Sequence, residues 1–428
     1  MRTPPPAPER APTGSADARR IVAARGLRSF AYGLLAVVLG IWLARIGLST
    51  VAIGGIITVS LVGDFCGTYL IGIAADAWGR RRTLVALALL MAATGAIFGL
   101  TRFYPLLLGA AFFGTLGASA SESAPFLPIE QSMLPQTAPP ERRTALFARY
   151  NLIATIGGAL GALAAGVPDL LAHDEAARTI GIRALFGVYV VAALGVTWLA
   201  AGLSPAVEAP RGASAASPAK RARALVPHLG RSRGAVLRLS ALFSLDAFAG
   251  GFVVQSLMTL YFHLRFGVSL AELAALFFAV NTVTALSFLA VGPIARRIGL
   301  LNTMVFTHLP SNLLLVLVAF MPTYPLAAAV LLARQSLSQM DVPTRQAYTM
   351  ALVAPEERTA AASVTSMARS AGSSLSPVLA GLLLQPALLA LGLPFVVAGI
   401  LKVGQDLGLW LVFRRVRIEE DDAAGGTP

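Results

Sequence analysis

Charged side chains interrupt several long apolar stretches of this 428-residue chain. A charge inside a membrane-spanning segment costs about 2.5–3.5 kcal/mol on insertion scales, so it normally faces a partner, an aqueous cavity or a ligand. The acids in such stretches are Asp64, Glu122, Asp246, Asp341 and Asp406. The bases are Arg149, Arg334, Arg369 and Lys402. These residues are the first candidates for chemistry.

Three of the acids are candidates for proton coupling. Asp64 lies in the middle of its apolar stretch, too far from either end to reach water easily. Its carboxyl either binds a proton or cation, or packs helices as a neutral or partnered group. Glu122 follows the small residues 117–121, which permit close helix packing, so the same two interpretations apply. Asp246 is nearer one end of its stretch, where lining the mouth of a cavity is the alternative to coupling.

Arg334 and Arg369 are candidates for substrate binding or coupling. A guanidinium group stays charged in a protein, so each arginine needs an acid, a cluster of carbonyl oxygens or an anionic substrate. Lys402 and Asp406 are four residues apart, and this spacing predicts an ion pair along one helix.

Twelve membrane-spanning helices are predicted to position these residues. The chain is 56% hydrophobic and only 13% charged, and its mean hydropathy is +0.72, which indicates an integral membrane protein. A bilayer core needs about 20 apolar helical residues, and the stretches lack the alternation of a transmembrane barrel. The first six are Phe30–Ile46, Val51–Ala75, Leu84–Leu100, Tyr104–Ile129, Thr144–Val167 and Ala184–Leu203. The second six are Leu239–Phe262, Ala271–Ile294, Leu300–Phe320, Leu326–Ala347, Ala360–Leu384 and Pro394–Val412.

Basic residues are distributed unequally over the two sides of these stretches. With both termini on one side, that side holds 25 of the 34 Lys and Arg residues and the other side holds five. The positive-inside rule then predicts that both termini are cytoplasmic, in a multi-pass protein of a plasma membrane or bacterial inner membrane. This distribution accounts for the formal net charge of +13, so we expect no nucleic-acid partner.

The composition divides the chain into five segments. Residues 1–28 are rich in Pro, Ala and Arg and are expected to form a disordered cytoplasmic arm. Residues 204–234 have the polar, helix-breaking composition of a cytoplasmic linker. This linker separates a first six-helix bundle at 29–203 from a second at 235–415. Residues 416–428 are expected to form a cytoplasmic tail.

The two halves repeat each other. Matching segments recur in the same order at offsets of 215 to 220 residues: 45–49 with 265–269, Gly72 and Gly79 with Gly292 and Gly299, and 140–145 with 355–360. Such recurrence indicates a duplicated six-span unit. Because six is an even number, both copies have the same orientation, as in transporters that rock one bundle against the other.

The segment at 72–82 has the sequence Gly-Ile-Ala-Ala-Asp-Ala-Trp-Gly-Arg-Arg-Arg. It resembles the loop motif of the major facilitator superfamily, Gly-x-x-x-Asp-(Arg/Lys)-x-Gly-Arg-(Arg/Lys), with Ala77 where that family usually has a base. The second copy keeps both glycines but has Arg296 in place of the acid. The resemblance covers roughly residues 28–415. It implies an all-α fold of two parallel-repeat six-helix bundles and secondary transport by alternating access.

Gly72, Asp76, Gly79 and Arg80 are predicted to form a conformational latch. Gly72 allows two helices to approach closely, and Gly79 can adopt the positive φ of a tight turn. Asp76 faces the negative end of its helix dipole, so it needs a cationic partner such as Arg80. The resemblance implies that this latch steadies the outward-facing state and breaks as the bundles rock.

The resemblance favours proton-coupled efflux of a small organic molecule. Residues 157–166 and 372–381 resemble the glycine-rich run of antiporter members, although the first copy lacks its proline. The fourth stretch lacks the arginine that drug exporters of the family commonly carry. The alternative is uptake or exchange of an anionic metabolite, for which Arg334 and Arg369 would be ligands.

A membrane-embedded enzyme is an alternative of another class, and the sequence disfavours it. The histidines lie far apart without metal-ligand spacing: His173, His228, His263 and His308. The chain has no phosphate-binding Gly-x-x-x-x-Gly-Lys-(Ser/Thr) loop, and the single Cys66 excludes a disulfide within it. We therefore expect no cofactor or metal. The expected partners are the lipid bilayer, a small-molecule substrate and protons, for a protein that acts as a monomer.

Overall fold

The computed structural model describes residues 13–117, 125–208, 230 and 232–416. Every regular element within these ranges is helical. The first bundle contains α1 (Thr13–Arg45), α2 (Thr50–Trp78), α3 (Arg80–Leu100), α4 (Tyr104–Phe113), α5 (Phe126–Met133), α6 (Pro140–Ala164), α7 (Val167–Leu171) and α8 (Glu175–Ala201). The second contains α10 (Arg233–Gly251), α11 (Gln255–Phe266), α12 (Leu270–Ile298), α13 (Leu300–Ala319), α14 (Tyr324–Ser338), α15 (Asp341–Ala351), α16 (Arg358–Leu383), α17 (Pro386–Leu389) and α18 (Leu393–Phe413).

The chain passes twelve times between the two ends of the molecule, which confirms the predicted number. Nine helical segments of the described part are long and apolar enough to cross a bilayer by themselves. The other three passes are the α4–α5 pair, the α14–α15 pair and α16. The first, second, third, fifth and sixth passes of each half lie on the stretches that the sequence predicts.

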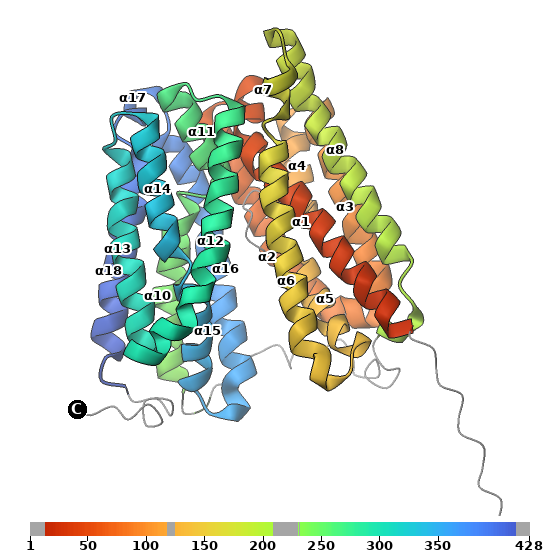
Figure 1. Ribbon diagram of the computed structural model, residues 1–428, viewed down its shortest axis with the longest axis vertical. Helices are drawn as coiled ribbons and strands as arrows, with labels where there is room; N and C mark the ends of the chain where they lie inside the picture. Colours follow the sequence, from red (N-terminus) through yellow and green to blue (C-terminus); the bar gives the residue numbers. More distant parts are fainter. Residues whose placement is uncertain (1–12, 118–124, 209–229, 231, 417–428) are drawn as a thin grey trace, which may run out of the picture.

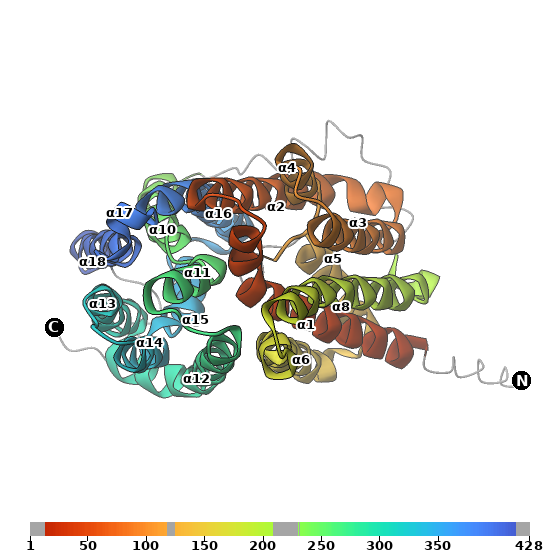
Figure 2. The ribbon, with the colours of Figure 1, turned by 90° about the horizontal axis from the view of Figure 1, so that it is seen from above.

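The two bundles stand side by side (Figure 1). We call the end where α1 begins and α18 ends the terminal end, and the opposite end the far end. The bundles meet through α1 with α11, α2 with α16 and α6 with α12 (Figure 2). Toward the terminal end their backbones diverge (Figure 1). The molecule is therefore closed at the far end.

Small residues allow the close approach of α2 and α16. A Cβ atom on Gly54 would collide with the carbonyl of Pro377, and one on Gly381 would collide with the carbonyl of Thr50. Pro377 interrupts the helical hydrogen bonding of α16. The neighbouring Val378 N–H donates instead to Thr58 Oγ1 in the other bundle, at 3.0 Å. The two helices are therefore in backbone contact and share one hydrogen bond.

The repeat predicted from sequence is confirmed at the far-end turns. Gly47 and Gly267 both have positive φ, 94° and 64°, as the matched segments require. The serine two residues later caps the next helix in each copy: Ser49 accepts from the Ala52 N–H, and Ser269 from the Glu272 N–H. The same kind of turn and serine cap therefore connects the first two passes in each half.

The expected disordered arm at 1–28 is wrong in its boundary, because α1 begins at Thr13. Ile21 and Val22 are buried in a core shared with α8. The Asp17 carboxylate accepts hydrogen bonds from the backbone N–H and the hydroxyl of Ser204, at 3.1 and 2.5 Å. The arginine-rich composition therefore belongs to a packed helix. Residues 1–12, 209–229, 231 and 417–428 lie outside the described residues, and with them most of the predicted linker and tail.

The fourth pass of each half is not the continuous helix that the sequence predicts. In the first half α4 ends at Phe113, and residues 114–117 are not helical; Gly117 has a φ of +62°. In the second half the helix ends at Ser338 and resumes at Asp341. Discontinuous helices at corresponding positions of two repeats mark binding regions in transporters.

Candidate functional site

Asp246 on α10 lies at the centre of a buried group of charges in the second bundle. Its carboxylate makes an ion pair with Lys402 Nζ of α18, and Arg369 Nη1 of α16 is 2.9 Å from its other oxygen. Arg345 on α15 is 3.8 Å away and His308 Nε2 on α13 is 3.9 Å away. We call Asp246, His308, Asp341, Arg345, Arg369, Lys402 and Asp406 the C-bundle charge cluster. This cluster brings together two predicted site residues, Asp246 and Arg369, which are 123 residues apart in the sequence.

Asp406 belongs to this cluster through a different partner from the one predicted. His308 Nδ1 is 2.9 Å from its Oδ1, and Asn312 Nδ2 donates to its Oδ2 at 2.8 Å. The predicted Lys402–Asp406 ion pair is therefore wrong. Lys402 instead pairs with Asp246 on α10, and the Asp406 carboxylate is occupied by His308 and Asn312.

Asp341 and Arg345 form the pair at the start of α15. Arg345 Nη1 is 2.5 Å from Asp341 Oδ2, one helical turn away. The short break between α14 and α15 places both side chains at the cluster. Arg345 was not singled out from the sequence, because a base near a helix end normally reaches the membrane surface.

Arg334 on α14 is buried beside the cluster without an acid of its own. Only 7% of its surface is exposed. Its Nη1 donates to Gln335 Oε1 at 3.1 Å, and Gln335 in turn donates to Thr284 Oγ1 on α12 at 2.7 Å. Within the described residues no carboxylate lies at ion-pair distance from Arg334.

Asp64 is the buried acid of the first bundle. It lies on α2 between Gly63 and Gly67. Gly63 packs against the backbone of Phe112 and Gly67 packs against Pro125, both in the broken fourth pass. Among the described residues it has no hydrogen bond or ion pair. Glu122, the second candidate in this bundle, lies outside the described residues.

A second buried charge group in the first bundle was missed by the sequence analysis. Arg28 Nη1 and Nη2 bind the two oxygens of Glu130 at 2.5 and 2.8 Å. The Tyr150 hydroxyl donates to the same carboxylate at 2.6 Å, and the Arg28 guanidinium lies 4.4 Å from the Phe126 ring centroid. All four groups lie inside the bundle. This arrangement holds α1, α5 and α6 together.

The predicted latch is described only in part. Gly79 has a φ of +105°, as expected for the turn between α2 and α3. The backbone N–H groups of Arg80 and Arg81 donate to the two carboxylate oxygens of Glu208, at 2.7 and 3.2 Å. The side chain of Asp76 and the surroundings of Gly72 lie outside the described part of the structure. The contact of Asp76 with Arg80 stays a prediction.

A carboxylate of the first bundle caps a helix of the second at the far end. Asp169 Oδ2 on α7 accepts from the backbone N–H groups of Leu270 and Ala271, at 2.5 and 3.2 Å. These are the first two donors of α12, which the Ser269–Glu272 capping box leaves free. Arg178 Nε of the first bundle holds the other oxygen at 2.9 Å.

Comparison with known proteins decides the family. A model of the Major Facilitator Superfamily matches residues 21–338. The chain belongs to the major facilitator superfamily. The uncharacterized membrane protein YJR124C of Saccharomyces cerevisiae is 28% identical over 427 residues, covering 93% of this chain and 94% of that protein.

Solved structures of other transporters share the fold. A bacterial homolog of the human lysosomal transporter Spinster superimposes with a TM-score of 0.71 at 18% identity, covering 98% of this chain and 99% of that chain. A D-xylose-proton symporter gives 0.71 at 17%, covering 92% and 97%. The nucleoside transporter NupG gives 0.68 at 15%, covering 93% and 99%. Membership of the superfamily makes the chain a multi-pass membrane transporter rather than an enzyme. The names of these structures cover different substrates, so the shared fold does not give the substrate.

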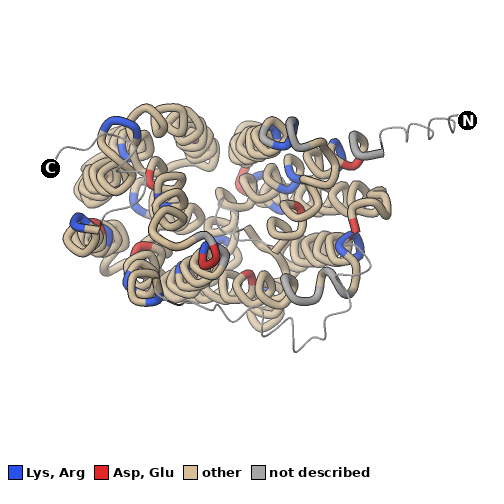
Figure 3. The backbone as a smooth tube through the Cα atoms, turned by 90° about the horizontal axis from the view of Figure 1, so that it is seen from below, with Lys and Arg blue, Asp and Glu red and all other residues tan. Residues whose placement is uncertain are grey.

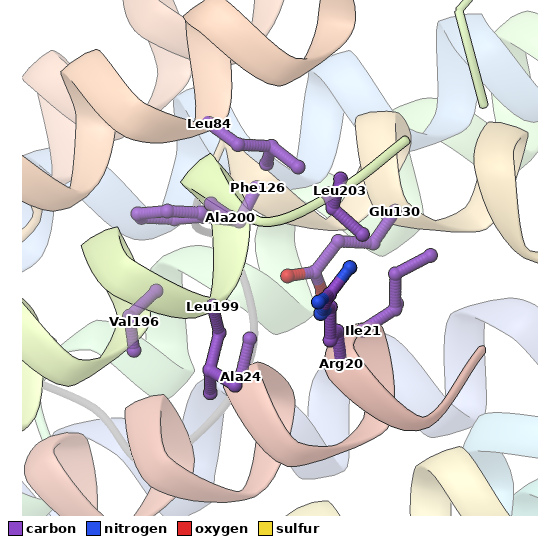
Figure 4. Close-up of a pocket in the computed structure, with 10 residues that line it drawn as sticks. All are labelled: Arg20, Ile21, Ala24, Leu84, Phe126, Glu130, Val196, Leu199, Ala200 and Leu203. Carbon is purple, nitrogen blue, oxygen red and sulfur yellow. The ribbon is translucent and has the colours of Figure 1, made fainter. Parts of the chain in front are cut away.

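A small pocket near the terminal end of this superfamily member does not offer a substrate site. Apolar side chains of α1, α3, α5 and α8 line it, with Arg20 and Glu130 at its edge (Figure 4). Its volume of about 10 Å³ is about the minimum for one water molecule. An organic substrate needs several hundred cubic ångströms, so the charged residues of the two bundles remain the better candidates.

Proposed function

We propose that this protein is a proton-coupled secondary transporter that exports a small organic molecule by alternating access, and that Asp64 carries the coupling proton. The observation that carries the proposal is a buried carboxyl without a described partner, placed against a broken helix of the first bundle. An ionised carboxylate is expensive there, whereas a protonated one is not. Gain and loss of a proton therefore change the free-energy cost of keeping the Asp64 side chain buried beside this helix.

The unequal distribution of basic residues supports cytoplasmic termini. Lys and Arg residues lie in both bundles at the terminal end (Figure 3). The positive-inside rule assigns this end to the cytoplasm of a plasma membrane or bacterial inner membrane. With that orientation the closed far end is extracellular, and the structure corresponds to an inward-facing state. In the opposite state we expect Asp76 and Arg80 to form the latch.

Export is the direction that we propose from the glycine-rich runs at 157–166 and 372–381. The same glycines also have a packing role: a Cβ atom on Gly161 would collide with the carbonyl of Phe30, and one on Gly372 with that of Ser244. Close packing accounts for small residues at these positions in an exporter and in an importer alike.

The test uses proteoliposomes with an imposed pH gradient and a substrate screen. Asp64→Asn should abolish gradient-driven accumulation while substrate exchange across the membrane continues, because the bundles can still rock with a permanently neutral side chain. Glu356→Gln, which changes an exposed carboxyl in the loop before α16, should leave both activities intact. Full gradient-driven accumulation by Asp64→Asn would remove Asp64 from the mechanism and move the role to Glu122 or Asp246.

A specific observation also favours the alternative of an anionic substrate. Arg334 is buried without an acid in the described part of the second bundle. This alternative concerns the kind of substrate, and it is compatible with proton coupling at Asp64 in the first bundle.

A further inference from the structure

We propose that the second bundle binds the acid group of a small organic anion at Arg334, with Arg369 as the contact at the entry. This inference rests on the proposed transport function, and it names the substrate class. The group that fits is a carboxylate or phosphate on an organic molecule, because a guanidinium offers two parallel donors that match two acid oxygens.

The first argument is the incomplete hydrogen bonding of Arg334. Its Nη1 has one neutral acceptor, the Gln335 amide oxygen. Its Nε is buried and has no hydrogen-bond acceptor within the residues that the structure describes. Gln335 has a single acceptor oxygen, and its Nε2 donates to Thr284 Oγ1, so it offers no acceptor beyond the one that Arg334 Nη1 uses. A charged side chain of a residue that is only 7% exposed, with one amide oxygen as its acceptor, is costly unless a further acceptor arrives.

The second argument is that every described acid nearby already has a base. Asp246 binds both Lys402 and Arg369. Asp341 binds Arg345, and Asp406 binds His308 and Asn312. None of these carboxylates can pair with Arg334 without giving up a shorter contact. An acid that satisfies Arg334 must therefore come from outside this group.

The third argument is the charge balance of the region. The C-bundle charge cluster contains three carboxylates and three permanent bases, so its formal charge is zero with His308 neutral. Arg334 adds one uncompensated positive charge. One monovalent acid group would restore neutrality.

Arg369 is the base of the cluster that an incoming anion reaches first. Its side chain is 30% exposed, against 12% for Arg345 and 8% for Lys402. Because Lys402 also binds Asp246, Arg369 can turn toward a ligand while that carboxylate keeps a partner. Arg369 thus offers the entry contact, and Arg334 the buried one.

The position of Arg334 fits a ligand site. It lies about one turn before the break between α14 and α15, and the matching fourth pass of the first bundle is also broken. Half-helices that end inside a bundle free backbone polar groups for a ligand. The acid group would lie at such a break.

The experiment measures thermal stabilisation of the purified full-length protein in detergent, without a gradient. The probes are benzoate and succinate, their neutral relatives benzamide and succinamide, and inorganic phosphate. We expect at least one acid probe to raise the melting temperature and the amides to leave it unchanged. Arg334→Gln should weaken the response by about tenfold in probe concentration or more, because a charge-assisted pair is lost.

The controls separate charge from folding. Arg415→Gln, an exposed base at the end of α18, should respond like the wild type. Should Arg334→Gln fail to fold, Arg334→Lys keeps the charge but loses the two-donor fork, and it should still weaken acid binding. Equal stabilisation by acids and amides, an unchanged response of the Arg334 variants, or no response to any acid probe would overturn the proposal. The measurement involves no proton gradient, so its failure leaves the Asp64 test unaffected, and the reverse also holds.

Discussion

Asp169→Asn is expected to open the far end of the molecule. In the structure this carboxylate of the first bundle accepts two backbone N–H groups at the start of α12 in the second bundle. In a state open at the far end the two bundles separate there, and the contact is lost. The substitution therefore raises the free energy of the far-end-closed state and leaves the other state unchanged.

The magnitude follows from the bonds involved. Hydrogen bonds to a charged group contribute about 1.5–3 kcal/mol each, and neutral ones about 0.5–1.5 kcal/mol. A negative charge at a helix N-terminus adds about 0.3–1 kcal/mol. The two bonds to the charged oxygen and the charge at the helix end together contribute about 3–7 kcal/mol, and asparagine restores about 0.5–1.5 kcal/mol through one neutral acceptor. We therefore expect a net loss of about 2–6 kcal/mol, or a shift of about 30-fold or more in the equilibrium. The Arg178–Asp169 pair lies within the first bundle and is present in both states, so its loss cancels.

The assay is the distance between two spin labels across the far end. Leu171→Cys on α7 and Leu391→Cys before α18 are exposed positions on opposite bundles, and Cys66→Ser removes the native thiol. Asp169→Asn should increase the population with the longer distance. Asp174→Asn is the matched control, because Asp174 caps α8 within its own bundle by accepting from the Ala177 N–H at 2.6 Å. An unchanged distribution in Asp169→Asn, or an equal shift in Asp174→Asn, would refute the reasoning.

Two further predictions concern topology and stability. An impermeant thiol reagent applied to intact cells should label His173→Cys at the far end but not Ser214→Cys in the linker; labelling of Ser214→Cys would contradict cytoplasmic termini. Glu130→Gln should lower the free energy of unfolding by about 3–5 kcal/mol, because Arg28 is left buried without its acid. Chemical denaturation would measure this, and a loss no larger than that of the exposed Glu356→Gln would show that Arg28 finds another partner.

Features that depend on neighbouring residues could be predicted from the sequence. Apolar length predicted the twelve passes, and the match of 45–49 with 265–269 predicted a repeat, which the structure shows as a turn and a cap in both halves. Hydrogen bonds and packing of this kind form within a few residues. They are therefore visible in local spacing, and the structure confirms them.

Features that depend on distant residues could not be predicted. Lys402 and Asp406 share a helix, yet each has its partner on another helix, 156 and 98 residues away. His308 was counted among scattered histidines because nothing near it in sequence indicates Asp406. Arg28 looked like part of a disordered arm because its acid, Glu130, is 102 residues away. In each case the partner is set by helix packing, which spacing along the chain does not reveal.

The helix pair α2 and α16 connects the two proposed sites physically. Asp64 lies six residues after Thr58 on α2, and Arg369 lies nine residues before Val378 on α16. Thr58 and Val378 are joined by a hydrogen bond at the point where glycines bring the two backbones into contact. A change in charge at Asp64 and a ligand at Arg369 therefore act on two helices that touch across the bundle interface in this state. Each would bias the same rocking movement, and by thermodynamic linkage proton binding and anion binding would change each other's affinity by the same factor.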